Sequence, residues 1–407
     1  MSVYSSGNVK TKLLEPANYN ENISAEFRIL EPCLPNLRLI DVGAKNNQDI
    51  QYNKLLGAYG CLRSVLLYSG QLLLDGTPNI AQYMAFKKYN LPNAVNRSMS
   101  RLMTRNQLGF KINDANVMVD EPLVNNQSGI TDAKTTMAFV SVSEYCPLLE
   151  KLNVLDPAVF ENLRLVIEFE PDRNAFLNKT DSTSHNGRRP RLIMDCLAPG
   201  SYEPNPSAIS WNAIEHDRFD CPVIGRGAND NKLQPNNVRL NGFNSKLVGR
   251  ILMTKNFQDL SKNATGGSVN GFGRYASHAQ NKSQIQVTIN GAQQLPRNGV
   301  EGVGNKELNL LNDTWGLCNT IPYGNLSGPK DTNLYLAQVK EYIGQQSYFG
   351  MFINQRVKDF QINFTRTGKT DTTTDILPIN EALTCMVFAE VSKSLKIGGG
   401  QVSIMYN

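Results

Sequence analysis

A strand-rich pattern that occurs twice along the chain constrains its fold more than any other feature. In the first half, the run Leu62–Asp75 (LRSVLLYSGQLLLD) consists of two apolar segments joined at Ser69-Gly70. In the second half, the run Gln284–Pro296 (QIQVTINGAQQLP) has the same form and is joined at Asn290-Gly291. Asparagine and glycine tolerate the positive φ angles of tight two-residue turns, so each run predicts a β-hairpin.

Each half also contains a later segment with period-two alternation. In Asn162–Glu170 (NLRLVIEFE), large apolar residues occupy every second position, whereas Glu168 and Glu170 fall on the opposite face. Val357–Arg366 (VKDFQINFTR) is the counterpart in the second half. This period is typical of a strand with one buried face. The duplicated pattern therefore predicts two similar β-sheet units in tandem.

The chain is long enough for two separate cores. It has 407 residues, 41% of them hydrophobic, which suits two domains of about 200 residues each. Short helices are expected at Ile80–Tyr89, Cys146–Leu152 and Asn333–Ile343, but no βαβ alternation appears. We therefore predict an all-β protein of two tandem jelly-roll β-sandwiches with short helices in the connecting loops.

Local composition divides the chain into four segments. Residues 1–26 are polar and lack periodicity, which predicts an N-terminal arm outside the core. Residues 222–244 are rich in Gly, Asn, Asp and Pro, which predicts a linker. The first jelly roll is then expected over residues 27–221 and the second over residues 245–407.

Charge and cysteine usage limit the partners and the compartment. The net charge of +5 is small for a protein that reads nucleic acid, so no specific nucleic-acid recognition is expected. The seven cysteines are scattered without a CxxC pair, which argues against zinc-ribbon or thioredoxin-like sites and indicates reduced thiols inside a cell. The N-terminus lacks an apolar signal segment, and no apolar stretch is long enough to span a membrane.

Two acidic groupings have the residue types of catalytic or metal sites. The triplet Glu215-His216-Asp217 is one, but consecutive residues of an extended chain point to opposite faces and do not converge. Glu168 and Glu170 are the other, since paired carboxylates hydrolyse glycosidic bonds. The solvated side of a strand explains this pair more simply.

Two glycine-containing motifs match nucleotide-binding loops only in part. Arg366–Thr370 (RTGKT) has Asn363 where a phosphate loop needs its first glycine, and no helix is expected after it. Gly271–Ala276 (GFGRYA) lacks the flanking strand and helix of a dinucleotide site. We therefore predict no catalytic residue, no cofactor-binding residue, no cofactor and no metal ligand, and we expect that the protein is not an enzyme.

Basic and aromatic residues offer no clearer site. Arg188, Arg189 and Arg191 form the densest basic cluster, and solvated arginines in an exposed loop are expected there rather than a phosphate-binding or targeting site. Trp211 and Trp315 are the only tryptophans. Each is expected to anchor packing near a turn rather than to stack on a ligand.

Several segments together resemble one known family. A hairpin before a helix lies in Gly57–Asp75, and a short helix leads into a strand in Glu144–Glu170. Ile209–Phe219 and Val238–Phe257 form the crossing into the second unit, and Gln286–Gly316 is a hairpin run ending in LNDTWG. The closing strands are FGMFINQRVKDFQINFTRTG and MVFAEVSKSLKI. Over about residues 30–407 their order resembles the double jelly-roll major capsid proteins of the polinton-like virus, virophage and adintovirus group.

This resemblance implies a structural role in a virion. In the family, two jelly rolls stand side by side and three copies form a pseudo-hexagonal capsomer of an icosahedral shell around double-stranded DNA. The implied partners are the chain itself as a homotrimer, neighbouring capsomers, and penton or minor capsid proteins. The implied location is the virion, assembled inside the host cell without secretion. Residues 1–26 would then tie neighbouring capsomers together.

Two alternative functions stay open. A carbohydrate-binding or carbohydrate-active β-sandwich protein is motivated by Glu168, Glu170 and aromatic loops around Tyr202 and Tyr323. The missing signal segment and the presence of only two tryptophans count against it. A minor or vertex capsid protein is the other alternative, and the tandem pattern counts against it because a pentameric vertex protein usually needs one jelly roll.

Overall fold

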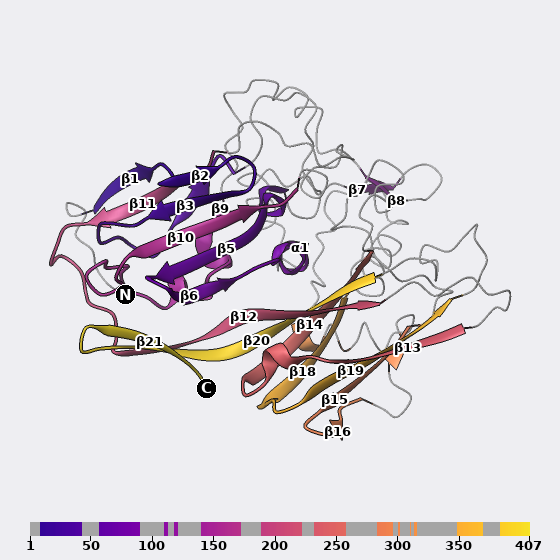
Figure 1. Ribbon diagram of the computed structural model, residues 1–407. Coiled ribbons are helices and arrows are strands. Elements are labelled where there is room, and N and C mark those ends of the chain that lie inside the picture. The colour runs from indigo at the N-terminus through magenta and orange to yellow at the C-terminus, as the bar shows by residue number, and fades with distance from the viewer. Residues whose placement is uncertain are drawn as a thin grey trace.

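The computed structural model describes thirteen segments of the chain: residues 9–42, 57–89, 110–112, 118–120, 140–171, 189–221, 232–257, 283–295, 300–301, 310, 313–315, 348–368 and 383–407. They form two β-sandwiches, one from each half of the chain, with the first resting against a long sheet of the second (Figure 1).

The first sandwich consists of two antiparallel sheets. One has the strand order β1-β11-β4-β9, with bounds Val9–Leu14, Arg191–Leu197, Arg38–Ile40 and Val140–Ser141. The other has the order β2-β3-β10-β5-β6, with bounds Asn18–Asn20, Ser24–Arg28, Leu163–Phe169, Leu62–Ser69 and Leu72–Thr77.

The second sandwich also has two antiparallel sheets. One has the order β12-β20-β14-β18, with bounds Ala208–Cys221, Leu383–Gly398, Leu247–Phe257 and Tyr348–Arg356. The other has the order β13-β19-β15-β16, with bounds Lys232–Arg239, Phe360–Gly368, Ser283–Ile289 and Ala292–Gln293. Two further strands extend these sheets: β17 (Val300–Glu301) pairs with β15, and β21 (Gln401–Tyr406) pairs with β20.

The two sandwiches share one topology. For this comparison the hairpin β2–β3 counts as one strand, and four strands are set aside: the hairpin of β7 (Phe110–Ile112) and β8 (Met118–Asp120) and the two extension strands β17 and β21. Each unit then contributes eight strands in sequence. In both units the first, eighth, third and sixth strands form one sheet, and the second, seventh, fourth and fifth form the other. Eight antiparallel strands in two such sheets make a jelly roll. The predicted fold of two tandem jelly rolls is therefore confirmed.

Local sequence explains the hairpins and the alternating strand. Asn290 and Gly291 have φ angles of 53° and 78°, as the predicted two-residue turn between β15 and β16 requires. Gly70 turns the chain between β5 and β6 with a φ of 56°. In β10, residues on alternate positions are buried from Leu163 to Phe169, as the period of two predicts.

The structure corrects the predicted arm. Residues 9–14 form β1, which pairs with β11 over six residues, and β2 and β3 cover much of the rest up to residue 26. β1 and β2 are the outermost strands of their sheets. No residue of β1 is fully buried, and edge strands commonly carry charged residues such as Lys10 and Lys12, so the strand has little apolar periodicity.

The structure also corrects the predicted linker and the boundary between the units. β13 lies within residues 222–244, and as the outermost strand of its sheet it accommodates Pro235. β12, expected in the first unit, pairs along its whole length with β20 of the second. The units therefore meet between β11 and β12, and the second jelly roll begins at Ala208 rather than at residue 245.

The helices in the described segments are short. The predicted helix at residues 80–89 is confirmed as α1 (Ala81–Tyr89). The one predicted at residues 146–152 is the single 3₁₀ turn Pro147–Glu150, and further 3₁₀ turns occupy Gly57–Cys61, Val142–Glu144 and Asn241–Phe243. Asn333–Ile343 lies outside the described residues. No described helix is both long and apolar enough to cross a membrane.

Two hydrophobic cores lie between the sheets, and one extends beyond its own unit. The second core consists of second-unit residues alone. The first core also includes eight residues of the second unit: Ile209, Trp211, Ala213, Ile214, Leu252, Met386, Phe388 and Leu395. The contact between the two jelly rolls is thus part of the first core.

Candidate functional site at the junction of the two jelly rolls

The long strand β12 contributes one of its faces to both cores. Ile209, Trp211 and Ala213 belong to the first core, whereas Phe219 and Cys221, at positions of the same parity, belong to the second. Strands twist along their length, so one face of a strand of 14 residues can turn from one neighbour to another. The acidic segment around Glu215 occupies the place where this change occurs.

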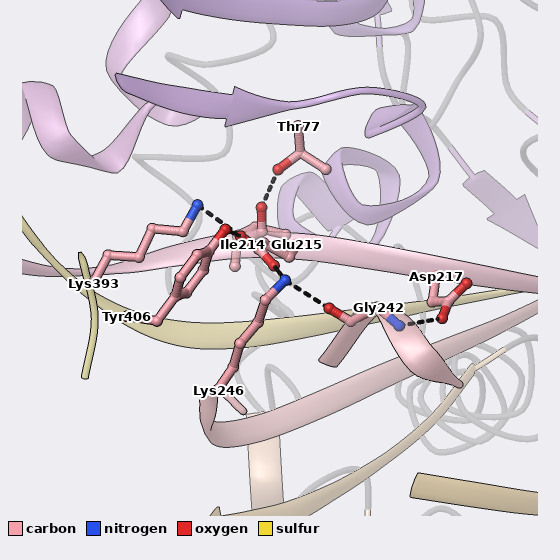
Figure 2. A network of polar contacts seen from close by, with 8 residues as sticks. All are labelled: Thr77, Ile214, Glu215, Asp217, Gly242, Lys246, Lys393 and Tyr406. Carbon is pink, nitrogen blue, oxygen red and sulfur yellow. Dashed lines mark hydrogen bonds and ion pairs between the residues drawn. The ribbon is translucent and has the colours of Figure 1, made fainter. Parts of the chain in front are cut away.

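Glu215 is the centre of a polar network at this place (Figure 2). Its Oε1 accepts from Lys393 Nζ of β20 at 2.6 Å and from the Tyr406 hydroxyl of β21 at 2.9 Å. Its Oε2 accepts from Lys246 Nζ, which precedes β14, at 2.5 Å. Side chains from the segment before β14 and from the paired strands β20 and β21 therefore converge on one carboxylate of β12.

The two lysines also interact with an aromatic ring and with the backbone. Lys246 Nζ lies 4.7 Å and Lys393 Nζ 5.0 Å from the centroid of the Tyr406 ring, within cation–π range. Lys246 also donates to the carbonyl of Gly242 at 2.6 Å. These contacts help to hold the C-terminal strand β21, whose Val402 and Ile404 pack against the first core.

The ionisation of Glu215 reflects two opposing effects. Burial disfavours the charged carboxylate, but the attraction of Lys393 and the hydrogen bonds from Lys246 and Lys393 outweigh it. The pKa of Glu215 is therefore lower than its ordinary value. The network is held as an ion pair with two cations sharing one anion.

Direct hydrogen bonds connect the two units beside this network. The Thr77 hydroxyl of β6 donates to the carbonyl of Ile214 in β12 (Figure 2). Thr254 of β14 donates from its hydroxyl to Gln82 of α1 at 2.5 Å. Polar contacts thus accompany the shared apolar core.

The helix α1 packs its aromatic side chains onto the second unit. Tyr83 lies 5.6 Å from Phe388 of β20 between ring centroids. Tyr83 and Phe86 each meet Trp315 edge-on at 5.9 Å. The guanidinium of Arg250 lies 3.9 Å from the Trp315 ring, so a cation completes this aromatic cluster.

Asp75 of β6 is a second buried carboxyl group at the junction. It is 2% exposed and accepts from the backbone N–H of Leu148 at 2.7 Å. Burial raises the pKa of Asp75, and the backbone N–H groups of Leu148 and Gly76 and the charge of Lys393 offset this effect only in part. Lys393 therefore interacts electrostatically with carboxyl groups on two different strands.

A pocket of about 490 Å³ opens between β6 and the Glu215 network. The first unit lines it with Leu72, Leu73 and Pro78. The second unit lines it with the members of the network and with Ile404 of β21. Leu73 and Tyr406 are 37% and 44% exposed, so the pocket has an open rim.

The members of the acidic triplet do not converge on one point. Glu215 binds the lysines, whereas the carboxylate of Asp217 accepts from the backbone N–H groups of Gly242 and Arg218 at 2.9 and 2.8 Å. The His216 ring lies 6.0 Å from Phe388, and burial lowers the pKa of its imidazole. No group of three or more His, Cys, Asp or Glu that could hold a metal occurs in the described segments.

The other carboxylate pair lies away from the pocket. The Ser64 hydroxyl donates to Glu168 at 2.7 Å, and the Glu170 side chain is buried with an exposed fraction of 7%. In the loop around Tyr202, the tyrosine hydroxyl donates to Asp156 at 2.6 Å. Neither carboxylate of the pair lines the junction pocket. Tyr323 lies outside the described residues.

The two arginines of the basic cluster that the structure describes both lie against carboxylates. Arg191 binds Asp41 through two N–H groups at 2.9 and 2.6 Å. Arg189 lies 3.4 Å from a carboxylate oxygen of Glu15. Arg188 and the segment Gly271–Ala276 lie outside the described residues, as do the last two residues of the RTGKT motif.

Both tryptophans pack as anchors at the junction. Trp211 is 3% exposed within the first core. Trp315 donates from its indole N–H to the carbonyl of Ile251 at 2.9 Å. The anchor role expected for them agrees with these contacts.

The network residues carry little sequence signal. Lys246, Lys393 and Tyr406 lie in segments without a motif, and the pairing of β20 with β12, β14 and β21 brings them to Glu215. Trp211 and Lys393 are partners in that register. Correct strand pairing would have been needed to predict the site.

Comparison with solved structures identifies the architecture. A chain of the PBCV-1 virus capsid matches with a TM-score of 0.56 and 11% sequence identity, covering 100% of this chain and 99% of that chain. The mavirus major capsid protein matches with a TM-score of 0.55 and 10% identity, covering 100% and 91%. The Sputnik virophage structure matches with a TM-score of 0.54 and 10% identity, covering 100% and 90%.

Sequence comparison adds nothing to this likeness, because no protein-family model and no curated protein matches the chain. The sequence identities are only 10–11%, so the structural match shows that the fold is shared. The match extends over the whole chain and nearly the whole of each viral protein. The chain therefore has the double jelly-roll fold of these viral capsid proteins.

Proposed function

We propose that the protein is a major capsid protein, which forms a homotrimeric capsomer of an icosahedral virus shell. The observation that carries the proposal is the extent of the structural match. Two jelly rolls with the same strand order account for the described fold, and the match covers at least 90% of the PBCV-1, mavirus and Sputnik chains. A single jelly roll, as in a vertex protein, would match only half of such a chain.

The way the two units join suits a building block. Eight residues of the second unit complete the core of the first, and polar contacts from Thr77 and Thr254 cross the same junction. A shell subunit needs a fixed shape rather than a reactive site. The proposal therefore agrees with the ion pairing and hydrogen bonding of the charged residues singled out in the sequence.

The proposed partners follow from the capsomer. A stable trimer should bury about 2,000 Å² or more at each interface, with an apolar centre. Four described edge-strand and loop residues present exposed apolar side chains in the first unit: Leu13, Ile23, Leu30 and Leu73. We propose that contacts with neighbouring capsomers and with penton or minor capsid proteins complete a shell assembled inside the host cell.

The mass of the purified protein in solution tests this proposal. Size-exclusion chromatography with light scattering should give a particle of three times the 45.2 kDa chain mass. Electron microscopy of co-expressed or concentrated protein should then show pseudo-hexagonal capsomers. A monomer that stays monomeric at high concentration would contradict the proposal.

The carbohydrate alternative has little support in the site geometry. Glu168 is hydrogen-bonded to Ser64 and Glu170 is buried, so the pair does not form an open acid–base site. We propose that the protein has no glycosidase activity. A hydrolysis assay on a panel of glycans with the trimeric protein checks this statement.

A further inference from the structure

The lining of the junction pocket combines apolar and charged side chains. Leu72, Leu73, Pro78 and Ile404 are its apolar members, and the charged members belong to the Glu215 network, which Figure 2 shows. Its volume of about 490 Å³ falls within the range of small-molecule sites. The mixture of a few polar groups with apolar walls is also typical of such sites.

The lysine ammonium groups have hydrogen-bonding capacity left over. An ammonium carries three N–H donors. Lys246 uses two of them, on Glu215 Oε2 and the Gly242 carbonyl, and Lys393 uses one, on Glu215 Oε1. Three donors are thus left without an acceptor among the described residues, and Lys393 is only 7% exposed. Buried donors of this kind require an acceptor from a ligand or from water.

The charge of the lining favours an anion. Two ammonium groups and one carboxylate line the pocket, so one positive charge is in excess there. Asp217, just beyond the lining, directs its oxygens to the N–H groups of Gly242 and Arg218. Asp75 is not among the lining residues and is held toward its neutral form by burial. Neither carboxyl group occupies the pocket itself.

We propose that this pocket binds a carboxylate carried on a short aliphatic body. The carboxylate accepts the remaining N–H groups of Lys246 and Lys393, and the aliphatic part packs on the leucines of β6 and on Ile404. A charge-assisted pair of this kind is about twice as strong as a neutral hydrogen bond. Such a ligand touches both jelly rolls and so stabilises their junction.

The carboxylate has two conceivable sources, a free small acid or an acidic side chain of an extended peptide. Hexanoate serves as the probe for the first, and the peptide acetyl-Leu-Glu-Leu-amide for the second. Hexan-1-ol and hexylamine have the same aliphatic body without the negative charge. Each probe is titrated into the full-length protein, and saturation-transfer NMR gives the dissociation constant.

Three variants distinguish binding in the pocket from nonspecific binding and from loss of folding. Lys246→Met removes one cation while keeping the side-chain length, and Lys396→Met removes an exposed lysine of β20 outside the pocket. Leu73→Ser shortens the apolar rim at a partly exposed position, so folding should be preserved even where Lys246→Met destabilises the protein. Thermal unfolding confirms that each variant is folded before titration.

We expect a carboxylate probe to bind and raise the melting temperature, whereas hexan-1-ol and hexylamine leave it unchanged. Lys246→Met should weaken binding at least tenfold, about 1.4 kcal/mol, and Lys396→Met should not. If hexanoate binds and the peptide does not, the natural ligand is a free acid. If the peptide binds as tightly as hexanoate or more tightly, the natural ligand is a protein segment. Failure of both carboxylates to bind at about 10 mM, or binding unaffected by Lys246→Met and Leu73→Ser, would overturn the inference.

The test is independent of the proposed capsid function. The pocket lies within one chain, so binding is measurable whether the protein is a trimer or a monomer. Loss of the trimer would refute the capsomer, and loss of binding would refute the pocket ligand.

Discussion

Lys393 and Glu215 form an ion pair of 2.6 Å between two neighbouring strands, at the place where the cores of the two jelly rolls adjoin. The Lys393 side chain is 8% exposed and the Glu215 side chain 17% exposed. A buried cation that loses its partner carries an uncompensated desolvation cost, so this pair has strong consequences for stability.

Replacement of the carboxylate should destabilise the protein. Glu215→Ala leaves Lys393 and Lys246 without their shared anion and should lower the free energy of unfolding by about 3 kcal/mol. Glu215→Gln keeps an acceptor and should cost less. Denaturant unfolding measures both, with Glu161→Ala on an exposed position as the control. Equal values for Glu215→Ala and Glu161→Ala would show that the pair contributes nothing.

The same carboxylate should make stability depend on acid pH. The folded-state pKa of Glu215 is lower than the ordinary value of 4.5, so its contribution is complete above pH 4.5 and is lost as pH falls through the folded-state value. The difference in unfolding free energy between the native sequence and Glu215→Gln should therefore shrink below pH 4.5. A difference that stays constant down to pH 3 would contradict this assignment.

Asp75 should have the opposite pH dependence. Its folded-state pKa is raised above 3.8, so the unfolded chain releases the proton first and the contribution of this group to stability falls as pH rises above 3.8. Asp75→Asn keeps an acceptor for the Leu148 N–H group and removes the titration. The stability of this variant relative to the native sequence should rise from pH 4 toward neutral pH, as measured by unfolding at a series of pH values.

Asn290 should stabilise the hairpin through its backbone and its side chain. It has a φ of 53°, and its amide group accepts from the N–H of Lys358 at 2.6 Å and donates to the carbonyl of Arg356 at 2.9 Å. Asn290→Ala loses both contributions and should cost about 2 kcal/mol. Asn290→Gly keeps the favourable backbone and loses only the side-chain bonds, so its smaller cost separates the two effects.

The two jelly rolls should unfold together. Leu395 of the second unit is fully buried in the first core, and its replacement by alanine should cost about 2–5 kcal/mol. Scanning calorimetry should give one transition for the native chain, and Leu395→Ala should lower its midpoint without splitting it. Two separated transitions would show that the units are energetically independent.

The sequence predicted the elements that carry a strong local pattern. The hairpin at Asn290-Gly291 and the alternating strand Asn162–Glu170 needed only turn chemistry and a period of two, and both are confirmed. Edge strands such as β1 and β13 were missed because one polar face and a proline are tolerated there.

The junction network depended on information that a local pattern lacks. β12 was placed in the wrong unit because the register with β20, over fourteen residue pairs, is a long-range property. Local geometry predicts that Glu215, His216 and Asp217 do not converge, but the lysines that reach Glu215 depend on the same long-range pairing and carry no local signal. Their positions are separated by up to 178 residues in the chain (393 minus 215).

The shared first core has a mechanical consequence. Rotation of one jelly roll against the other would expose Trp211, Phe388 and Leu395 to water, so bending within the chain is energetically unfavourable. Each chain is then expected to behave as a rigid unit. In the proposed shell, curvature would have to come from the angles between separate molecules, and a change in particle diameter would require altered contacts between molecules rather than a change of shape within them.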